Sequence, residues 1–261
     1  MKPHAFAIRN LHAPRSGEFA APVRGMRKPQ VLKNLAQDII GRRSWAIVVE
    51  LHGVQNIIAA LKGSNAKTYA IWAGWITVAF FSVYPTLNWL TSLRPHRYQL
   101  YVPAELSIPF VPQFVWAYMS MYVLFLLPLF LMPAARMPAL GKQLVFGTIA
   151  SGIVFLILPA DLGFTRTIPS DPLYASIFAA IFGVDRPHNL VPSLHVVFSC
   201  AILLACADCA RRPMKMFLLA WGVLIVASTV LVHQHHLLDV ISAILLVMLL
   251  RRCFTWQNRA P

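Results

Sequence analysis

Long apolar runs separated by short polar segments dominate the chain from residue 68 onward. A helix that crosses a bilayer needs roughly 20 apolar residues, within a range of about 17 to 25. Six runs meet or approach this length, and the last three are the least defined because polar residues crowd their ends. We predict a transmembrane helix in each run, namely residues 68–90, 114–132, 143–159, 194–210, 214–232 and 237–250. The expected fold is therefore all-α, a polytopic membrane bundle of six transmembrane helices.

Residues 30–62 have a different pattern. Apolar residues such as Val31, Leu35 and Ile39 recur at helical spacing, and charged residues lie between them. This pattern is typical of an amphipathic helix that lies on a membrane surface or packs on a bundle. The expected organisation is a basic cytoplasmic segment with this helix over residues 1–67, a six-span membrane domain over 68–253 and a short cytoplasmic tail over 254–261.

The composition supports a membrane protein. Of the 261 residues, 58% are hydrophobic and 12% are charged, whereas a soluble domain usually carries about 25% charged residues. The formal net charge is +14, but a nucleic-acid-binding domain spreads basic residues over a polar surface. Here uncharged apolar runs separate them, so we expect the membrane and not a nucleic acid as the partner. The same numbers exclude a disordered chain and a disulfide-stapled secreted domain.

The basic residues also predict an orientation. If both termini are cytoplasmic, only four of the 23 Lys and Arg residues fall in outer loops, namely Arg94, Arg97, Arg166 and Arg186. Cytoplasmic loops of membrane proteins carry an excess of Lys and Arg. We therefore expect a multi-pass protein of a bacterial inner membrane or an equivalent membrane, with both ends in the cytoplasm. The oligomeric state is left open.

The predicted topology gathers ionisable residues at the outer ends of helices. His195 begins the run 194–210, and three histidines precede Asp239 near the start of the last run. These three are His233, His235 and His236. Ionisable groups at membrane depth are costly and mark functional sites. We expect a site at this outer face, which is periplasmic or luminal.

The spacing of these residues suits phosphate chemistry. His235 and Asp239 are four residues apart, so one helical turn brings them to the same face. A carboxylate there can accept the Nδ1 proton of His235 and leave Nε2 free to attack phosphorus. Spacing alone does not choose between His235 and the neighbouring histidines.

Further residues complete the predicted site. Ser193 in the segment Pro192-Ser193-Leu194-His195 can cap a helix whose first-turn amides favour an anion. His195 in that turn can protonate the leaving oxygen. Arg166 and Arg186 are the candidates to neutralise phosphate oxygens through forked hydrogen bonds.

These residues give the chain a resemblance to the type 2 phosphatidic acid phosphatase superfamily, and within it to the branch that includes inositol phosphorylceramide synthases. The family's second motif is Pro-Ser-Gly-His, which here reads Pro192-Ser193-Leu194-His195. Its third motif is Ser-Arg, five residues, His, three residues, Asp. The stretch from Ser228-Thr229 through His235 to Asp239 keeps that spacing, with Thr229 in place of Arg.

The first motif of the family is reduced in this chain. The family has Lys, six residues and then Arg-Pro, whereas Ala179 stands where Arg186-Pro187 would require Lys. The segment Phe164-Thr165-Arg166 looks like the branch's reduced version, which makes Arg166 the better phosphate ligand. The resemblance covers roughly residues 104–242.

The resemblance implies a function and a role for each matching residue. By resemblance, His235 is the nucleophile that forms a phosphohistidine, Asp239 orients it and His195 is the general acid. The implied protein is a metal-independent lipid phosphate phosphatase without a cofactor. Its substrate is expected to be a phospholipid, a sphingolipid or a polyprenyl phosphate.

Several alternatives stay open. The first is a phosphotransferase that moves a phosphorylated headgroup between lipids, as the inositol phosphorylceramide synthases do. The second is a transporter or scaffold without catalytic activity, whose histidines line a proton path. The histidine cluster before Asp239 could also bind a metal ion, although neighbouring side chains on a helix point apart. At the inner side, Asp208 is expected to pair with Arg211 or Arg212.

Overall fold

The computed structural model describes residues 63–255 of the chain. The amphipathic helix predicted over residues 30–62 therefore lies outside the described residues, as does most of the predicted tail. Within the described part the fold is all-helical, as predicted, and the only β-type pairing there is an isolated bridge between Tyr98 and Ala160.

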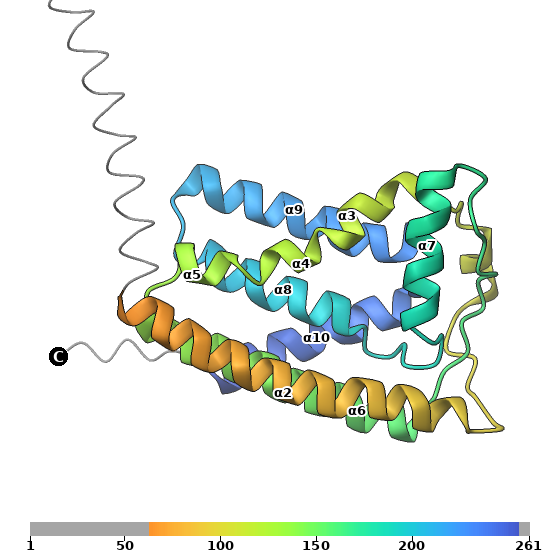
Figure 1. The fold of residues 1–261 in the computed structure, drawn as a ribbon, viewed down its shortest axis with the longest axis horizontal. Helices are drawn as coiled ribbons and strands as arrows, with labels where there is room; N and C mark the ends of the chain where they lie inside the picture. Colours follow the sequence, from red (N-terminus) through yellow and green to blue (C-terminus); the bar gives the residue numbers. More distant parts are fainter. Residues whose placement is uncertain (1–62, 256–261) are drawn as a thin grey trace, which may run out of the picture. The chain divides into compact units, whose positions relative to one another are not determined.

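Between residues 63 and 255 the chain forms six longer helices and three short ones, whose arrangement Figure 1 shows. The longer helices are α2 (Ser64–Ser92), α6 (Met137–Ile157), α7 (Pro172–Val184), α8 (Leu194–Ala207), α9 (Arg212–Leu231) and α10 (Leu237–Cys253). The short ones are α3 (Val115–Met119), α4 (Met121–Leu124) and α5 (Leu127–Leu131). Single 3-10 turns are η1 (Pro103–Ser107), η2 (Pro112–Phe114) and η3 (Ala134–Arg136).

Three of the described helical segments are long and apolar enough to cross a membrane: Ser64–Ser92, Ala134–Ile157 and Arg212–Leu231. Their outer surfaces are apolar as well, since the side chains of Phe81 on α2 and Val223 on α9 are 67% and 70% exposed. Such surfaces are costly in water but suit a lipid environment. The protein is thus consistent with an integral membrane protein. The helices α8 and α10, at 14 and 17 residues, are shorter than these segments.

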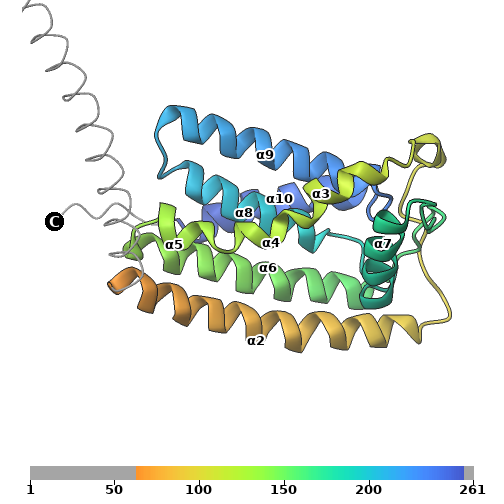
Figure 2. The ribbon, with the colours of Figure 1, turned by 45° about the horizontal axis from the view of Figure 1, so that its top comes forward.

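The second predicted span is not one continuous helix. Residues 112–131, which include most of this run, form η2, α3, α4 and α5 in succession. The three short helices lie along α8 and α9 (Figures 1 and 2). Pro128 has no amide hydrogen, and its ring clashes with the carbonyl four residues earlier, that of Leu124, where α4 ends. At the other break, the Ser120 hydroxyl donates to the carbonyl of Ala117 and competes with the helical pattern.

The helix α8 forms the centre of the bundle. Almost all of its residues are buried, and it contacts α6, α9 and α10 (Figure 1). The helices α2 and α6 run side by side, and two glycines of α6 permit their close approach (Figure 2). A Cβ atom at Gly152 would clash with Val83 and Leu87, and one at Gly141 would clash with Trp72. Small residues at such contacts are typical of helix packing in membranes.

Asp208 forms an ion pair, as predicted, but with a different arginine from the two that were predicted. Asp208 follows α8, and its carboxylate accepts from Arg251 at the end of α10 at 2.7 Å, not from Arg211 or Arg212. Sequence proximity favoured the neighbouring arginines, but Arg211 and Arg212 lead directly into α9. The tertiary packing of α10 against α8 brings Arg251 to Asp208 instead.

Candidate active site

The segment between α9 and α10 carries the three histidines and is held by the end of α9. The amide N–H groups of Gln234 and His235 both donate to the carbonyl oxygen of Thr229, at 3.0 Å each. The hydroxyl of Thr229 donates to the carbonyl of Val226 within α9. Thr229 therefore anchors the backbone of the histidine segment.

His235 and Asp239 form a dyad at the N-terminus of α10, where Asp239 lies in the first turn and His235 precedes the N-cap residue His236. The Asp239 Oδ2 atom accepts from His235 Nδ1 at 3.1 Å and from the backbone N–H of His236 at 2.8 Å. Both side chains are almost fully buried. With Asp239 ionised, His235 carries its proton on Nδ1, so the lone pair lies on Nε2. His235 lines a large cavity, and the dyad orients it there.

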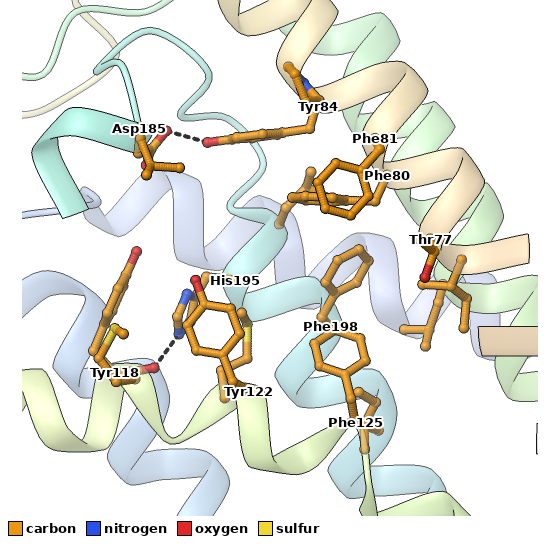
Figure 3. A pocket seen from close by; sticks show the side chains of 18 of the residues that line it. Thr77, Phe80, Phe81, Tyr84, Tyr118, Tyr122, Phe125, Asp185, His195 and Phe198 are labelled. Carbon is orange, nitrogen blue, oxygen red and sulfur yellow. Dashed lines mark hydrogen bonds between the residues drawn. The ribbon is translucent and has the colours of Figure 1, made fainter. Parts of the chain in front are cut away.

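His195 lines the same cavity from the first turn of α8. Ser193 is the N-cap of this helix, and its hydroxyl oxygen accepts from the backbone N–H of Val196 at 3.3 Å. His195 Nε2 donates to the carbonyl oxygen of Tyr118 at 2.8 Å, and the two rings stack with centroids 3.9 Å apart (Figure 3). Among the described residues no partner binds Nδ1, which leaves this nitrogen to exchange a proton with a ligand.

The cavity has a volume of about 1140 Å³ and two chemically distinct parts. At its polar end it is lined by Tyr84, Tyr118, Asp185, His195 and His235. The remainder is lined mainly by apolar side chains of α2, α4, α5, α6 and α8, such as Phe80, Phe125, Leu144, Phe198 and Ile202 (Figure 3). On α2 the lining runs from Tyr69 to Trp89, which at about 1.5 Å per residue is roughly 30 Å.

The two predicted arginines take different positions. Arg186 lines the cavity but is exposed, and its guanidinium donates to the hydroxyl of Ser92. Arg166 is not among the lining residues. Its Nη1 donates to the carbonyl oxygen of Asp185 at 2.7 Å, and its guanidinium lies over the ring of Phe182. Burial lowers the pKa of Arg166, and its Nε has no partner in the described part of the chain.

The structure thus brings only some of the predicted site residues together. His195, His235 and Arg186 line one cavity, and Asp239 bonds to His235 behind it. Ser193 is fully buried, is absent from the lining and acts as a helix cap. Arg166 lies behind the segment that begins at Asp185, which it holds through a backbone carbonyl.

The other two histidines of the cluster, His233 and His236, form hydrogen bonds that hold neighbouring segments together. The N–H of Gly163 donates to His236 Nε2 at 3.1 Å, so the His236 proton is on Nδ1 and is donated to Glu105 Oε2 at 3.3 Å. Burial lowers the pKa of His236. His233 Nε2 donates to the carbonyl of Ile108 at 2.9 Å. Of the three histidines only His235 lines the cavity, which distinguishes it from its neighbours.

Glu105 completes this packing arrangement, and sequence reasoning missed it. Its Oε2 accepts from the backbone N–H of Leu237 at 2.8 Å, and its Oε1 accepts from that of Val102 at 2.9 Å. Although burial opposes its charge, these donors and His236 hold the pKa of Glu105 below its ordinary value. Glu105 therefore fastens the segment before η2 to the start of α10. The sequence does contain a signal for this role, because Glu105 is a single acidic residue within a proline-rich apolar stretch.

Two further residues at the polar end were also missed. Asp185 follows α7 and its carboxylate accepts from the hydroxyl of Tyr84 on α2 (Figure 3). Burial raises the pKa of Asp185, while the Tyr84 hydrogen bond and the charges of His235 and Arg166 oppose this rise. The sequence offered one signal, since Asp185 directly precedes Arg186-Pro187.

The arrangement can support nucleophilic catalysis on phosphorus. An oriented imidazole and a second imidazole with a free nitrogen line one end of an apolar cavity, close enough for their charges to interact. Within residues 63–255, no three His, Cys, Asp or Glu side chains converge as metal ligands would. The chain matches no family model, no curated protein and no solved structure.

Proposed function

We propose that the protein is an integral membrane enzyme that hydrolyses a lipid phosphate ester through a phosphohistidine on His235. The observation that carries the proposal is the His235–Asp239 dyad, which lies with His195 at the polar end of a largely apolar cavity. A buried, oriented imidazole beside a second imidazole is a costly arrangement that packing alone does not need. The roles agree with those implied by the resemblance to the type 2 phosphatidic acid phosphatase superfamily.

The reaction has two steps. In the first, His235 Nε2 forms a bond to phosphorus while the bond from phosphorus to the lipid oxygen breaks. The imidazolium form of His195, which carries a proton on each ring nitrogen, gives its Nδ1 proton to that oxygen and keeps the one on Nε2. Asp239 stabilises the charge that develops on the His235 ring. In the second step a water oxygen bonds to phosphorus, the N–P bond breaks and the water proton returns to His195. The residues of the chain suffice for both steps, so the proposed reaction is metal-independent.

The cavity supports a lipid as the substrate. With the polar end included, its lining extends about 30 Å along α2, about the thickness of the hydrocarbon core of a bilayer. A hydrocarbon chain in the apolar part would place its phosphate at the polar end beside His195 and His235. Phospholipids, sphingolipids and polyprenyl phosphates all have this chemistry.

The proposed topology has six spans, with both termini cytoplasmic and the site at the periplasmic or luminal face. The broken segment α3–α5 forms one span, and α8 and α10 complete the set with their flanking residues. At about 1.5 Å per residue the 17 residues of α10 extend roughly 26 Å, close to the hydrocarbon thickness. The start of α8 and the segment before α10 both line the polar end, which suits a site at a single face.

The experiment is a substrate screen with a matched pair of variants. Purified protein is given phosphatidic acid, a polyprenyl diphosphate, or phosphatidylinositol with ceramide, and phosphate release and lipid products are both measured. We expect His235→Ala to lower the activity at least about a thousand-fold. His96→Ala, at an exposed loop histidine, is the control and should retain activity. Full activity of folded His235→Ala would contradict the proposal, and absence of turnover would favour a transporter or scaffold.

A further inference from the structure

The carboxylate of Asp185 is an unexpected group in a site for phosphate. Asp185 lies at the end of α7 and lines the polar end of the cavity together with His195 and His235. Figure 3 shows its side chain directed toward Tyr84, whose hydroxyl donates to Oδ1. A phosphate group beside His235 would therefore have a carboxylate as a neighbour.

This carboxylate has no ion pair among the described residues. Its one side-chain hydrogen bond there comes from the neutral Tyr84, and Arg166 donates to the backbone carbonyl of Asp185 instead. The described ion pairs of other acidic groups are His235–Asp239, His236–Glu105 and Arg251–Asp208. The negative charge of Asp185 is therefore not cancelled by direct contact.

The two carboxylates near the site, Asp185 and Asp239, carry negative charge that no arginine side chain contacts directly. Arg166 does not line the cavity, and Arg186 is exposed and bonded to Ser92. Thr229, which stands in the position of a motif arginine, is neutral and bonds within α9. A phosphate monoester carries about 1.5 to 2 negative charges at pH 7 because its second pKa is about 6, whereas a diester keeps one. Repulsion by a fixed carboxylate is larger for the doubly charged group.

We propose that Asp185 makes this site select a singly charged phosphate, which means a phosphodiester lipid in preference to the dianion of a phosphomonoester. This inference rests on the proposed function. It assigns Asp185 as a specificity determinant, held in place by Tyr84 on one side and by Arg166 on its backbone. The monoanion of a monoester also fits, because its P–OH group can donate a hydrogen bond to the carboxylate.

With a diester the two steps remain balanced. The bond from His235 Nε2 to phosphorus forms, the bond from phosphorus to the lipid oxygen breaks, and the lipid alcohol leaves with a proton from His195. Water or an acceptor alcohol then bonds to phosphorus, the N–P bond breaks and the hydroxyl proton passes to His195. Water gives a phosphorylated headgroup, and an acceptor alcohol gives a new phosphodiester.

The test compares phosphatidic acid with phosphatidylmethanol, which differ by one methyl group and one ionisable oxygen. Both release diacylglycerol, so one product reports both reactions. At pH 8 we expect kcat/KM of the wild-type protein to favour phosphatidylmethanol. Asp185→Asn should shift the ratio of the two values about tenfold or more toward phosphatidic acid. Asp161→Asn, at an acidic loop residue outside the cavity lining, is the control and should leave the ratio unchanged.

The pH dependence of the ratio gives a second readout. The groups that act on Asp185 are Tyr84 on α2, Tyr118 on α3, Tyr122 on α4, Arg166 before α7 and His235 before α10. The same groups face both substrates, so the ratio reports chiefly the charge of the phosphate. In the wild-type protein, relative activity on phosphatidic acid should fall as pH rises through about 6 to 7, where the monoester loses its second proton. Asp185→Asn should flatten this fall.

Tyr84→Phe keeps the carboxyl group of Asp185 but removes its hydrogen-bond donor. Because this hydrogen bond opposes the rise in the pKa of Asp185, its loss favours the neutral carboxyl, so the ratio should shift in the same direction by a smaller factor. This variant also serves if Asp185→Asn does not fold. An unchanged ratio in folded variants, with turnover that still requires His235, would overturn the role of Asp185 alone. If the wild-type protein releases diacylglycerol from neither lipid and forms no phosphohistidine, both the proposed function and this inference are overturned.

Discussion

At the residue scale, the hydrogen bond from His235 Nδ1 to Asp239 decides which nitrogen is nucleophilic. Asp239→Asn should keep the shape of the site, but its amide can donate to Nδ1 and move the proton to Nε2. We expect kcat to fall about 10³- to 10⁴-fold, by analogy with the carboxylate of a serine protease triad. Steady-state kinetics and a thermal unfolding curve in detergent check this. A folded Asp239→Asn protein with near-normal kcat would contradict the assignment.

The buried pair of Glu105 and His236 predicts how stability depends on pH. Burial lowers the pKa of His236, so the unfolded chain binds more protons than the folded one as pH falls below about 6.5. The lowered pKa of Glu105 adds a further loss of stability below about pH 4.5. The unfolding temperature should therefore decrease from pH 7 to pH 5 and lower.

His236→Gln provides the variant for this measurement. It should reduce the pH dependence between pH 7 and 5 without abolishing it, because burial also lowers the pKa values of His188 and His233. The variant should be less stable by about 1 to 3 kcal/mol, since it disturbs the buried hydrogen bonds of Glu105 and Gly163. An unfolding temperature that rises toward pH 5 in the wild-type protein would refute the interpretation.

Residue-scale features were predictable where the contact is local. The spacing of four residues indicated the pair of His235 and Asp239, although the predicted helical face is not what joins them. His235 precedes the N-cap residue His236, and Asp239 in the first turn of α10 reaches back to both. The bond from Tyr84 to Asp185 joins residues 101 apart, and that from His236 to Glu105 joins residues 131 apart. No periodicity encodes such distances, because the packing of whole helices creates them.

At the element scale, the contact of α2 with α6 depends on the absence of a side chain at Gly152. Gly152→Ala places a Cβ against Val83 and Leu87 and should cost about 1 to 3 kcal/mol by overpacking. Gly74→Ala is the control, because no atom lies within 4 Å of its added Cβ. Thermal unfolding in detergent compares the two. Equal unfolding temperatures would show that α2 is not packed against Gly152 as described.

The elements themselves were predictable to different degrees. Continuous apolar runs indicated α2, α6 and α9 because a membrane helix needs an uninterrupted stretch of this length. The run 114–132 was predicted as one span interrupted by Pro128, and the break between α3 and α4 was not predicted. Pro128 gave a signal for one break, but the bond of Ser120 to Trp221 that accompanies the other is a tertiary contact.

At the scale of the whole molecule, the proposed topology makes the two ends of the bundle chemically distinguishable. The exposed Cys253 ends α10 at the proposed inner side, whereas Thr167 lies in a loop at the proposed outer side. In intact cells a membrane-impermeant maleimide should label Thr167→Cys and should not label the wild-type protein.

Permeabilised cells complete the topology experiment. Cys253 should then react, and Cys253→Ser should remove that signal. Labelling of wild-type Cys253 in intact cells, or protection of Thr167→Cys, would contradict the orientation. The predicted orientation came from counting basic residues on each side of the apolar runs, which needs no tertiary information.

The proposed function requires a covalent bond between His235 and phosphorus. The most direct measurement is rapid quenching of turnover with a lipid labelled at phosphorus, followed by peptide mapping under alkaline conditions that preserve phosphohistidine. We expect label on the peptide that contains His235, and none in His235→Ala. Label on another residue, or turnover of the lipid without any labelled protein, would contradict the proposed function.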